Sequence, residues 1–305
     1  MSRGSRARGG AFRGALDDVG GFPLSRVIAI ANQKGGVGKT TTSINLAASM
    51  TALCWRVLLV DLDPQGNATM GSGVDKHRLE HTSYDVLMHE LPLNHAVVEP
   101  PHAGYALVPS NGGLIAAEVE LLGVARREYR LREALAPVLD DYRLILIDCP
   151  PSLNMLTVNA LVAADGVIIP IQCEYYALEG LSSLLDTVGT VRETLNPKLE
   201  VQGLLRTMYD ARNNLADEVS AQLVEHFEDK VYRTLIPRNV RLAEAPSHGL
   251  PALMYDRASR GAQAYLSLAG ELVHQDNRAR RGMMPGGGES GTVPNAGARS
   301  IPDGS

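Results

Sequence analysis

The sequence predicts an α/β protein with a mostly parallel, twisted β-sheet that carries helices on both faces. Short runs of Val, Ile and Leu recur along the chain, and strands that are buried on both faces have this composition. Segments whose apolar residues have helical spacing separate most of these runs. Alternation of strands and helices is typical of parallel sheets, which bind ligands beyond the carboxyl ends of their strands.

Seven apolar runs are expected to form strands, at residues 26–31, 56–63, 105–110, 142–151, 166–172, 201–208 and 231–237. Helices are expected between most of them, at residues 40–53, 114–139, 152–164, 177–195, 214–228 and 258–273. The first of these helices is predicted from the spacing of its apolar residues Ile44, Ala47, Ala48 and Leu53.

A single ordered domain is expected from residue 25 to residue 275. The chain has 305 residues, of which 45% are hydrophobic, and this suits one large α/β domain. Residues 1–24 are rich in Arg and Gly and are expected to form a flexible arm, while residues 276–305 are expected to form a disordered tail. Two interpretations of the arm stay open: an inert extension, or extra phosphate contacts from Arg3, Arg6, Arg8 and Arg13.

Composition excludes several classes of protein. The net charge of −5 means that any surface for nucleic acid must be a local basic patch. No apolar run approaches the roughly 18 residues of a membrane span, and the N-terminus lacks the apolar core of a secretory signal. Cys54, Cys149 and Cys173 form no CxxC pair, which indicates a reducing, cytoplasmic setting without a structural disulfide or zinc site.

The stretch KGGVGKTT, residues 34–41, has the features of a phosphate-binding loop. It directly follows the first expected strand and opens the first expected helix. Glycines let backbone N–H groups surround a phosphate, and the helix N-terminus adds its positive dipole. Lys39 would reach the β- and γ-phosphates of a nucleotide, and the Thr40 hydroxyl would bind Mg²⁺. The strict GxxxxGK[ST] pattern is broken because Gln33 occupies its first glycine position. The alternative is a glycine-rich turn with a surface lysine.

Two groups of carboxylates follow strands beside this loop. Asp148 ends the run RLILID and is the candidate Walker B acid, which would hold Mg²⁺ and its waters. Asp61 and Asp63 end the run VLLVDLD on the same side of that strand. One of them would orient a metal-bound water, and the other would position the attacking water at the γ-phosphate. The alternative for this pair is N-capping or turn formation before Pro64.

The loop with its additional lysine, Lys34, resembles the deviant Walker A motif of the ParA/MinD group of ATPases, which implies a P-loop NTPase fold. Four further blocks are similar to the chromosomal ParA/Soj branch in order and spacing: VLLVDLDPQGNAT, LIDCPPSLNMLTVNAL, IPIQCEYYALEGLSSL and IPRNVRLAEAPSHGLP. The similarity extends from Arg26 to Glu271.

The resemblance implies a role for each candidate residue. Lys34 would contact the nucleotide of the partner subunit in an ATP-sandwich homodimer, although a solvated loop lysine is the simpler alternative. Asp63 would position the attacking water, Asp61 would be the Walker A′ acid, and Thr40, Asp63 and Asp148 would form the metal site. The expected ATP contacts are Lys34, Gly35, Gly36, Val37, Gly38, Lys39, Thr40, Thr41, Asp61, Met208, Pro237, Arg238 and Asn239.

The resemblance also implies an activity and partners. The family hydrolyses ATP slowly and binds DNA without sequence preference as an ATP dimer, and Arg212 and Arg241 match its DNA-contacting positions. A ParB-like centromere-binding protein would stimulate hydrolysis during chromosome or plasmid segregation, which places the protein on the nucleoid. A MinD-like, cell-division ATPase is the alternative, but residues 291–305 cannot form the amphipathic membrane helix that it requires. No contact with a membrane is therefore expected. A reductase with an iron–sulfur cluster does not fit Cys149 and Cys173, which are interpreted as small core residues.

Overall fold

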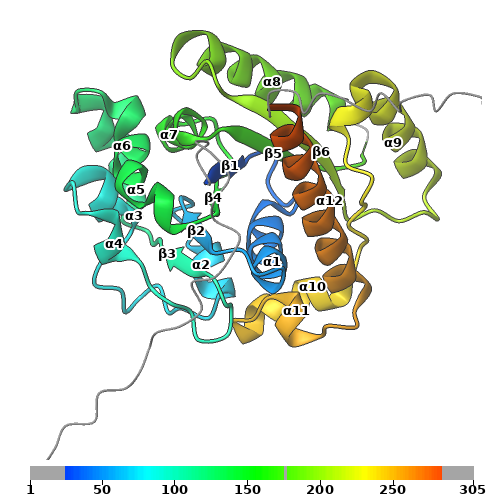
Figure 1. Cartoon of the computed structure of the whole chain (residues 1–305), viewed down its shortest axis with the longest axis horizontal. Coiled ribbons are helices and arrows are strands. Elements are labelled where there is room, and N and C mark those ends of the chain that lie inside the picture. Colours follow the sequence, from blue (N-terminus) through cyan, green and yellow to red (C-terminus); the bar gives the residue numbers. More distant parts are fainter. Residues whose placement is uncertain (1–24, 175–176, 284–305) are drawn as a thin grey trace, which may run out of the picture.

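A six-stranded, all-parallel β-sheet forms the centre of the protein (Figure 1). The computed structural model describes residues 25–174 and 177–283. The strand order across the sheet is β3-β2-β4-β1-β5-β6. The strands are β1 (Arg26–Ile30), β2 (Val57–Asp61), β3 (Ala106–Val108), β4 (Leu144–Asp148), β5 (Gly166–Gln172) and β6 (Glu200–Thr207). The predicted fold class is confirmed.

Helices cover both faces of the sheet, and none of those in the described residues combines the length and apolar character that crossing a bilayer requires. The longest are α1 (Lys39–Ala52), α7 (Met155–Ala163), α8 (Ala177–Thr194), α9 (Asn214–Phe227) and α12 (Arg260–Met283). The shorter ones are α2 (Asn67–Gly71), α3 (Ser83–Met88), α4 (Leu93–Ala96), α5 (Leu114–Glu120), α6 (Arg130–Leu135), α10 (Val240–Glu244) and α11 (Ala252–Tyr255).

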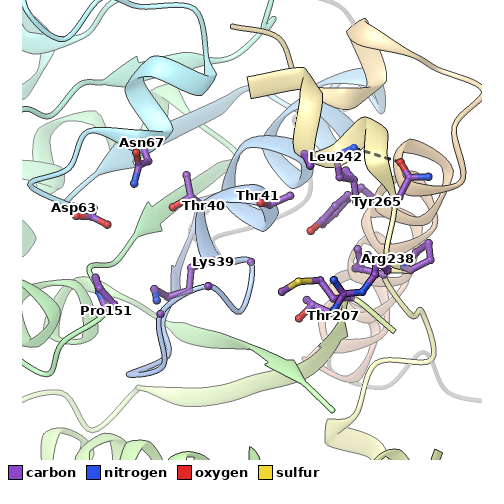
Figure 2. Close-up of a pocket in the computed structure, with 18 of the residues that line it drawn as sticks. Lys39, Thr40, Thr41, Asp63, Asn67, Pro151, Thr207, Arg238, Leu242 and Tyr265 are labelled. Atoms are coloured by element: carbon purple, nitrogen blue, oxygen red, sulfur yellow. Dashed lines mark hydrogen bonds between the residues drawn. The ribbon is translucent and has the colours of Figure 1, made fainter. Parts of the chain in front are cut away.

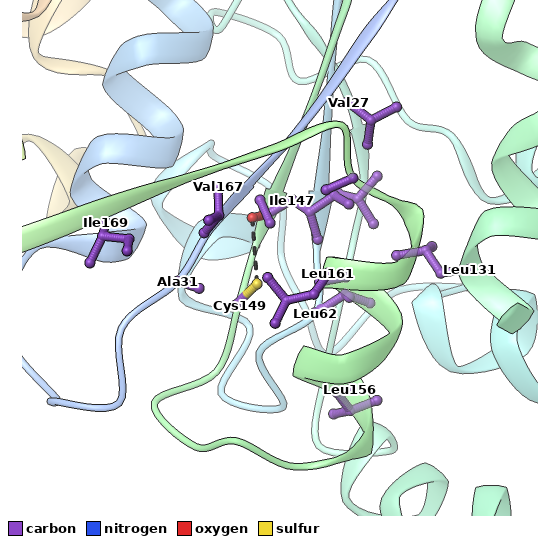
Figure 3. Close-up of a cluster of buried hydrophobic side chains, with 14 of the residues drawn as sticks. Val27, Ala31, Leu62, Leu131, Ile147, Cys149, Leu156, Leu161, Val167 and Ile169 are labelled. Carbon is purple, nitrogen blue, oxygen red and sulfur yellow. Dashed lines mark hydrogen bonds between the residues drawn. The ribbon is translucent and has the colours of Figure 1, made fainter. Parts of the chain in front are cut away.

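Each strand contributes to two separate cores because successive side chains point to opposite faces of a sheet. In β1, Val27 and Ala29 enter the core beneath α7 and α8, whereas Ile28 and Ile30 enter the core beneath α1 and α12. Figure 3 shows part of the first core, in which Cys149 lies among aliphatic side chains. Cys149 and Cys173 are both buried here, as expected of small core residues.

Two expected elements differ from the structure. Residues 231–237 form no strand but run beside β6 with isolated bridges at Val231 and Pro237. The Arg206 guanidinium donates to the Tyr232 carbonyl (2.7 Å), so this acceptor is bound by a side chain instead of by a neighbouring strand. Residues 114–139 form two short helices, α5 and α6, instead of one. Gly123 lies in the tight turn after α5, and Pro137 lies in the tight turn after α6.

The last helix extends further than its composition predicts. Helix α12 continues to Met283, so residues 276–283 of the expected tail are helical. Asp276 is buried and forms ion pairs with Arg26 (3.9 Å) and Arg143 (3.7 Å), which lie at the start of β1 and just before β4. Residues 276–283 are mostly polar and lack the apolar spacing that would have predicted a helix. The arm and residues 284–305 lie outside the described residues.

Gly203 in β6 is predicted to be required for packing. An added Cβ would lie 2.5 Å from Cε2 of the buried Tyr232 ring. Gly203→Ala should therefore lower the free energy of unfolding by about 1–3 kcal/mol, measured by urea denaturation. Gly189→Ala in α8 is the control, because its Cβ meets nothing within 4 Å and alanine favours a helix. Equal midpoints for the two variants would contradict this account of the β6 packing.

Candidate nucleotide-binding site

A cavity of about 460 Å³ opens at the carboxyl edge of the sheet, where a parallel α/β sheet is expected to bind its ligand. Its walls come from the loop after β1, the segments after β2 and β4, and the segment that follows β6. Figure 2 shows Asp63 and Pro151 on one side of the cavity and Thr207, Arg238 and Tyr265 on the other. The sheet therefore gathers the predicted loop and the predicted base-side segment around one space.

The glycine-rich loop has the geometry of an anion site. Gly36 and Gly38 have positive φ values of 74° and 89°, a conformation that favours glycine. Gly38 is the N-cap of α1, and no side chain caps this helix terminus. The first N–H groups of the helix and its dipole are therefore available to a phosphate.

Lys39 lies inside the loop. Its side chain is buried, lines the cavity, and donates from Nζ to the Lys34 carbonyl (3.1 Å). Burial lowers the pKa of Lys39, while Asp148, Cys149 and Asp63 oppose this shift. A lysine that is partly stripped of water and surrounded by carboxylates is well placed to bind a polyanion.

Asp148 lies behind the loop and holds the start of α1. Thr40 Oγ1 donates to Oδ2 and Ser43 Oγ donates to Oδ1, both at 2.8 Å. Burial raises the pKa of Asp148 to about 8, and the neighbouring Asp61 charge adds to the shift. Asp148 does not line the cavity, whereas Thr40 does. A hydroxyl backed by a carboxylate fits Mg²⁺, for which Thr40 would be the direct ligand and Asp148 would act through Thr40 or through a metal-bound water.

Asp61 ends β2 and does not line the cavity. It is completely buried and accepts hydrogen bonds from the backbone N–H groups of Asp63 (3.1 Å) and Thr69 (2.8 Å) and from Thr69 Oγ1 (2.7 Å). Burial raises its pKa to about 6. Asp61 is not among the residues that line the cavity, so in this structure it orders the segment from Asp63 to Thr69.

Asp63 lines the cavity opposite the loop. Its Oδ1 accepts from the Gln65 N–H (2.9 Å), and its carbonyl accepts from Ser110 Oγ (2.8 Å). Asp63 thus stabilises the turn after β2 and also lines the cavity. Among the described residues, no donor forms a hydrogen bond with the other carboxylate oxygen, Oδ2.

The expected base-side residues line the far end of the cavity, and these are Met208, Pro237, Arg238 and Asn239. Met208 has a positive φ of 49°, and the Asn239 side chain caps α10 through the Leu242 N–H (3.3 Å). Of the expected loop contacts, Gly35, Gly36, Gly38, Lys39, Thr40 and Thr41 line the cavity, whereas Val37 does not.

Sequence reasoning missed two wall residues, Thr207 and Tyr265, and one residue behind the wall, Ser43. Thr207 ends β6 and donates from Oγ1 to the Val37 carbonyl, while Tyr265 of α12 contacts Thr42 through its hydroxyl (3.0 Å). Ser43 could have been found, because it lies three residues after Thr40 on the same face of α1. Nothing in the local pattern around Thr207 or Tyr265 signals a site.

Three predicted residues lie outside the cavity and form ion pairs within the chain. Lys34 Nζ lies 2.6 Å from Glu174 Oε2, with both side chains nearly half exposed. Arg212 pairs with Asp210 (2.9 Å), whose pKa it lowers to about 2. Arg241 pairs with two carboxylates, those of Glu244 (2.8 Å) and Asp256 (3.3 Å). The structure therefore assigns the two loop lysines to different places.

Comparison with known proteins agrees with this geometry. Residues 25–201 match the AAA domain family. ParA, a chromosome-partitioning protein of Caulobacter vibrioides, is 53% identical over 82% of this chain and 95% of its own. Soj, the sporulation initiation inhibitor of Bacillus subtilis, is 52% identical over 82% of this chain and 99% of its own. The chain belongs to the ParA/Soj family. An uncharacterized protein of Pseudomonas putida is 64% identical over 85% of this chain and 98% of its own.

Two solved structures share the fold of this ParA/Soj chain. A protein from Mycobacterium smegmatis, described as cobyrinic acid a,c-diamide synthase with a bound ATP analog and magnesium, is 39% identical with a TM-score of 0.74. That alignment covers 84% of this chain and 97% of the other. The cell-division ATPase MinD of Pyrococcus furiosus, at 24% identity and a TM-score of 0.69, covers 82% of this chain and 99% of its own and shares the fold.

Substitution of Asp61 should lower the free energy of unfolding more than substitution of Asp63. Asp61→Ala removes the acceptor of three buried donors and should lower the free energy of unfolding by about 2–3 kcal/mol. Asp63→Ala removes the acceptor of one backbone N–H beside the open cavity and should cost less than about 1 kcal/mol. Urea denaturation without nucleotide measures both. A larger loss for Asp63→Ala would mean that Asp61 does not order this segment.

Proposed function

We propose that this ParA/Soj protein is an ATP-driven switch for DNA segregation, which dimerises with ATP, binds DNA, and is released by hydrolysis. The observation that carries the proposal is the separation of the two loop lysines. Lys39 lines the cavity, whereas Lys34 projects from the same loop outside it. Lys39 would thus bind the nucleotide of its own subunit, and Lys34 would bind the nucleotide of a second subunit.

ATP with Mg²⁺ is the ligand that fits the cavity. Loop N–H groups and Lys39 would hold the phosphates, and Thr40 backed by Asp148 would hold Mg²⁺. The M. smegmatis neighbour, which is described with an ATP analog and magnesium, supports this choice. Asp63 would position a water for in-line attack at the γ-phosphorus, breaking its bond to the β,γ-bridging oxygen to yield ADP and phosphate.

Lys34 gives a reason for ATP-dependent dimerisation. Two nucleotides that face each other repel, and a cation donated by each subunit to the other's phosphates offsets this repulsion. Lys34 would exchange its half-exposed ion pair with Glu174 for those phosphates, and an exposed pair of this kind is worth at most about 1 kcal/mol. Hydrolysis, slow in the isolated protein, would then also require the second subunit.

Arg212 and Arg241 would contact DNA. Each lies on the surface, and each is paired with carboxylates of its own chain, so a DNA phosphate must compete with them. Dimerisation doubles the number of these arginines, and affinity for DNA rises steeply with the number of phosphates neutralised. Binding without sequence preference would therefore follow the nucleotide state and hold the protein on the nucleoid in the cytoplasm.

A ParB-like centromere-binding protein is the partner that we infer, because the named relatives include chromosome-partitioning proteins. It would stimulate hydrolysis and release the dimer from DNA, which converts ATP turnover into movement of a chromosome or plasmid. The alternative, a MinD-like role in cell division, rests on a shared fold, and its membrane-bound cycle would require binding to lipid.

The two loop lysines should give different defects. Lys39→Ala should raise the Kd for ATP by about 100-fold or more, since charge-assisted bonds to the phosphates are lost. Lys34→Ala should keep ATP affinity within about threefold of wild type and lose the ATP-dependent dimer. Calorimetry and light scattering with a non-hydrolysable ATP analog measure these effects. Lys198→Ala, on the surface after α8, is the control. A Lys34→Ala protein that still dimerises would refute the action of Lys34 on the partner's nucleotide.

DNA binding is tested in an Asp63→Ala background, which should retain ATP and hold the dimer. Adding Arg212→Glu with Arg241→Glu should preserve dimerisation and weaken binding to plain DNA by about tenfold or more at roughly 100 mM salt. Arg78→Glu with Arg192→Glu makes the same charge change on exposed residues and is the control. Anionic vesicles replace DNA in a parallel assay. ATP-dependent binding to vesicles without binding to DNA would favour the MinD-like alternative.

A further inference from the structure

Thr207 connects the last strand of the sheet to the phosphate loop. It is the final residue of β6, is 2% exposed, and lines the cavity. Its Oγ1 donates to the Val37 carbonyl oxygen at 2.7 Å, a bond between residues 170 positions apart. Its side chain also lies beside Gly38, since a Cβ at Gly38 would be 3.8 Å from the Thr207 methyl carbon.

The orientation of the Val37–Gly38 peptide determines what the loop presents to a phosphate. A trans peptide is planar, and its C=O and N–H point in opposite directions. A carbonyl held toward Thr207 therefore turns the Gly38 N–H away from Thr207. If this peptide rotated, the carbonyl oxygen would replace the N–H and repel an anion. Gly38 has a φ of 89° and no side chain, so the sterics of this residue allow such a rotation.

The same strand end also positions the base-side wall. Met208, the next residue, has a φ of 49° and lines the cavity. The Tyr209 N–H donates to the Ile236 carbonyl (3.0 Å), and the Arg238 N–H donates to the Tyr209 carbonyl (3.1 Å). The end of β6 thus contacts both the phosphate loop, through Thr207, and the base-side wall, through Tyr209.

We propose that Thr207 is a positioning residue, whose hydroxyl holds the Val37 carbonyl so that the Gly38 N–H faces the bound phosphates. It acts through the loop, not by a contact with the reacting atoms. The inference rests on the proposed binding of ATP in this cavity. Its distinctive consequence is that loss of the hydroxyl weakens every polyphosphate ligand, including one without a base.

The test compares Thr207→Val, which keeps the shape and loses the donor, with Thr207→Ser, which keeps the donor. Calorimetry gives the Kd for ATP and for inorganic tripolyphosphate. Thr207→Val should raise both values by about tenfold, while Thr207→Ser should stay within about twofold of wild type. Thr51→Val is the matched control, because Thr51 Oγ1 donates to the Ala47 carbonyl (3.0 Å) in α1, away from the cavity. It should bind both ligands as wild type does.

Each other outcome has a defined meaning. Wild-type protein that does not bind ATP would refute the proposed function itself. Wild-type protein that binds ATP, together with Thr207→Val protein of equal affinity, would overturn only the role of Thr207. Thr207→Ser protein as weak as Thr207→Val would also overturn it, since the methyl group would then be responsible. If the valine variant does not fold, Thr207→Cys replaces it, and its weaker thiol donor should give an intermediate Kd. An unchanged Kd would overturn the role.

Discussion

The site depends on one buried carboxylate, Asp148, and on the two hydroxyls that it holds. Thr40 and Ser43 donate to its two oxygens, which ties the first turns of α1 to the end of β4. This link sets where the helix begins relative to the sheet, and with it the position of the phosphate loop that precedes the helix. A carboxylate with this much burial is stabilised only by such donors or by a nearby cation, so the same arrangement suits a metal-binding hydroxyl.

The parallel register brings the other groups to the same level. Ile30 at the end of β1 pairs with Asp148 on β4, and Asp148 pairs with Asp61 on β2. The loop after β1 and the segment after β2 therefore emerge at the same edge, on either side of β4. From there Asp61 orders the segment that carries Asp63, and Asp63 faces the cavity. The hydrogen bonds of the buried Asp61 side chain thus fix the position of Asp63, which lies beyond the end of the strand.

In the proposed function three charged side chains would contact other molecules, and in this structure each of them forms an ion pair within the chain. Lys34, Arg212 and Arg241 each bind a carboxylate at the surface. Surface ion pairs contribute little to stability, so they can be exchanged for phosphate contacts at small cost. In the monomer these pairs reduce the attraction of polyanions to isolated arginines. Such an arrangement fits a protein that should hold DNA only after a second subunit has joined.

Local sequence determined the fold class, the phosphate loop, the acids beside it and the family, because strand composition, helical spacing and loop motifs involve neighbouring residues. Tertiary structure decided the rest. Asp61 and Asp63 follow the same strand, yet only folding shows that the first orders a turn and the second lines the cavity. Ser43 and Thr207 joined the site through bonds that span 105 and 170 residues. The apolar composition of residues 231–237 predicted a strand, and the polar composition after residue 275 predicted a shorter α12. Composition does not show that the Tyr232 carbonyl binds Arg206 or that Asp276 forms an ion pair with Arg26.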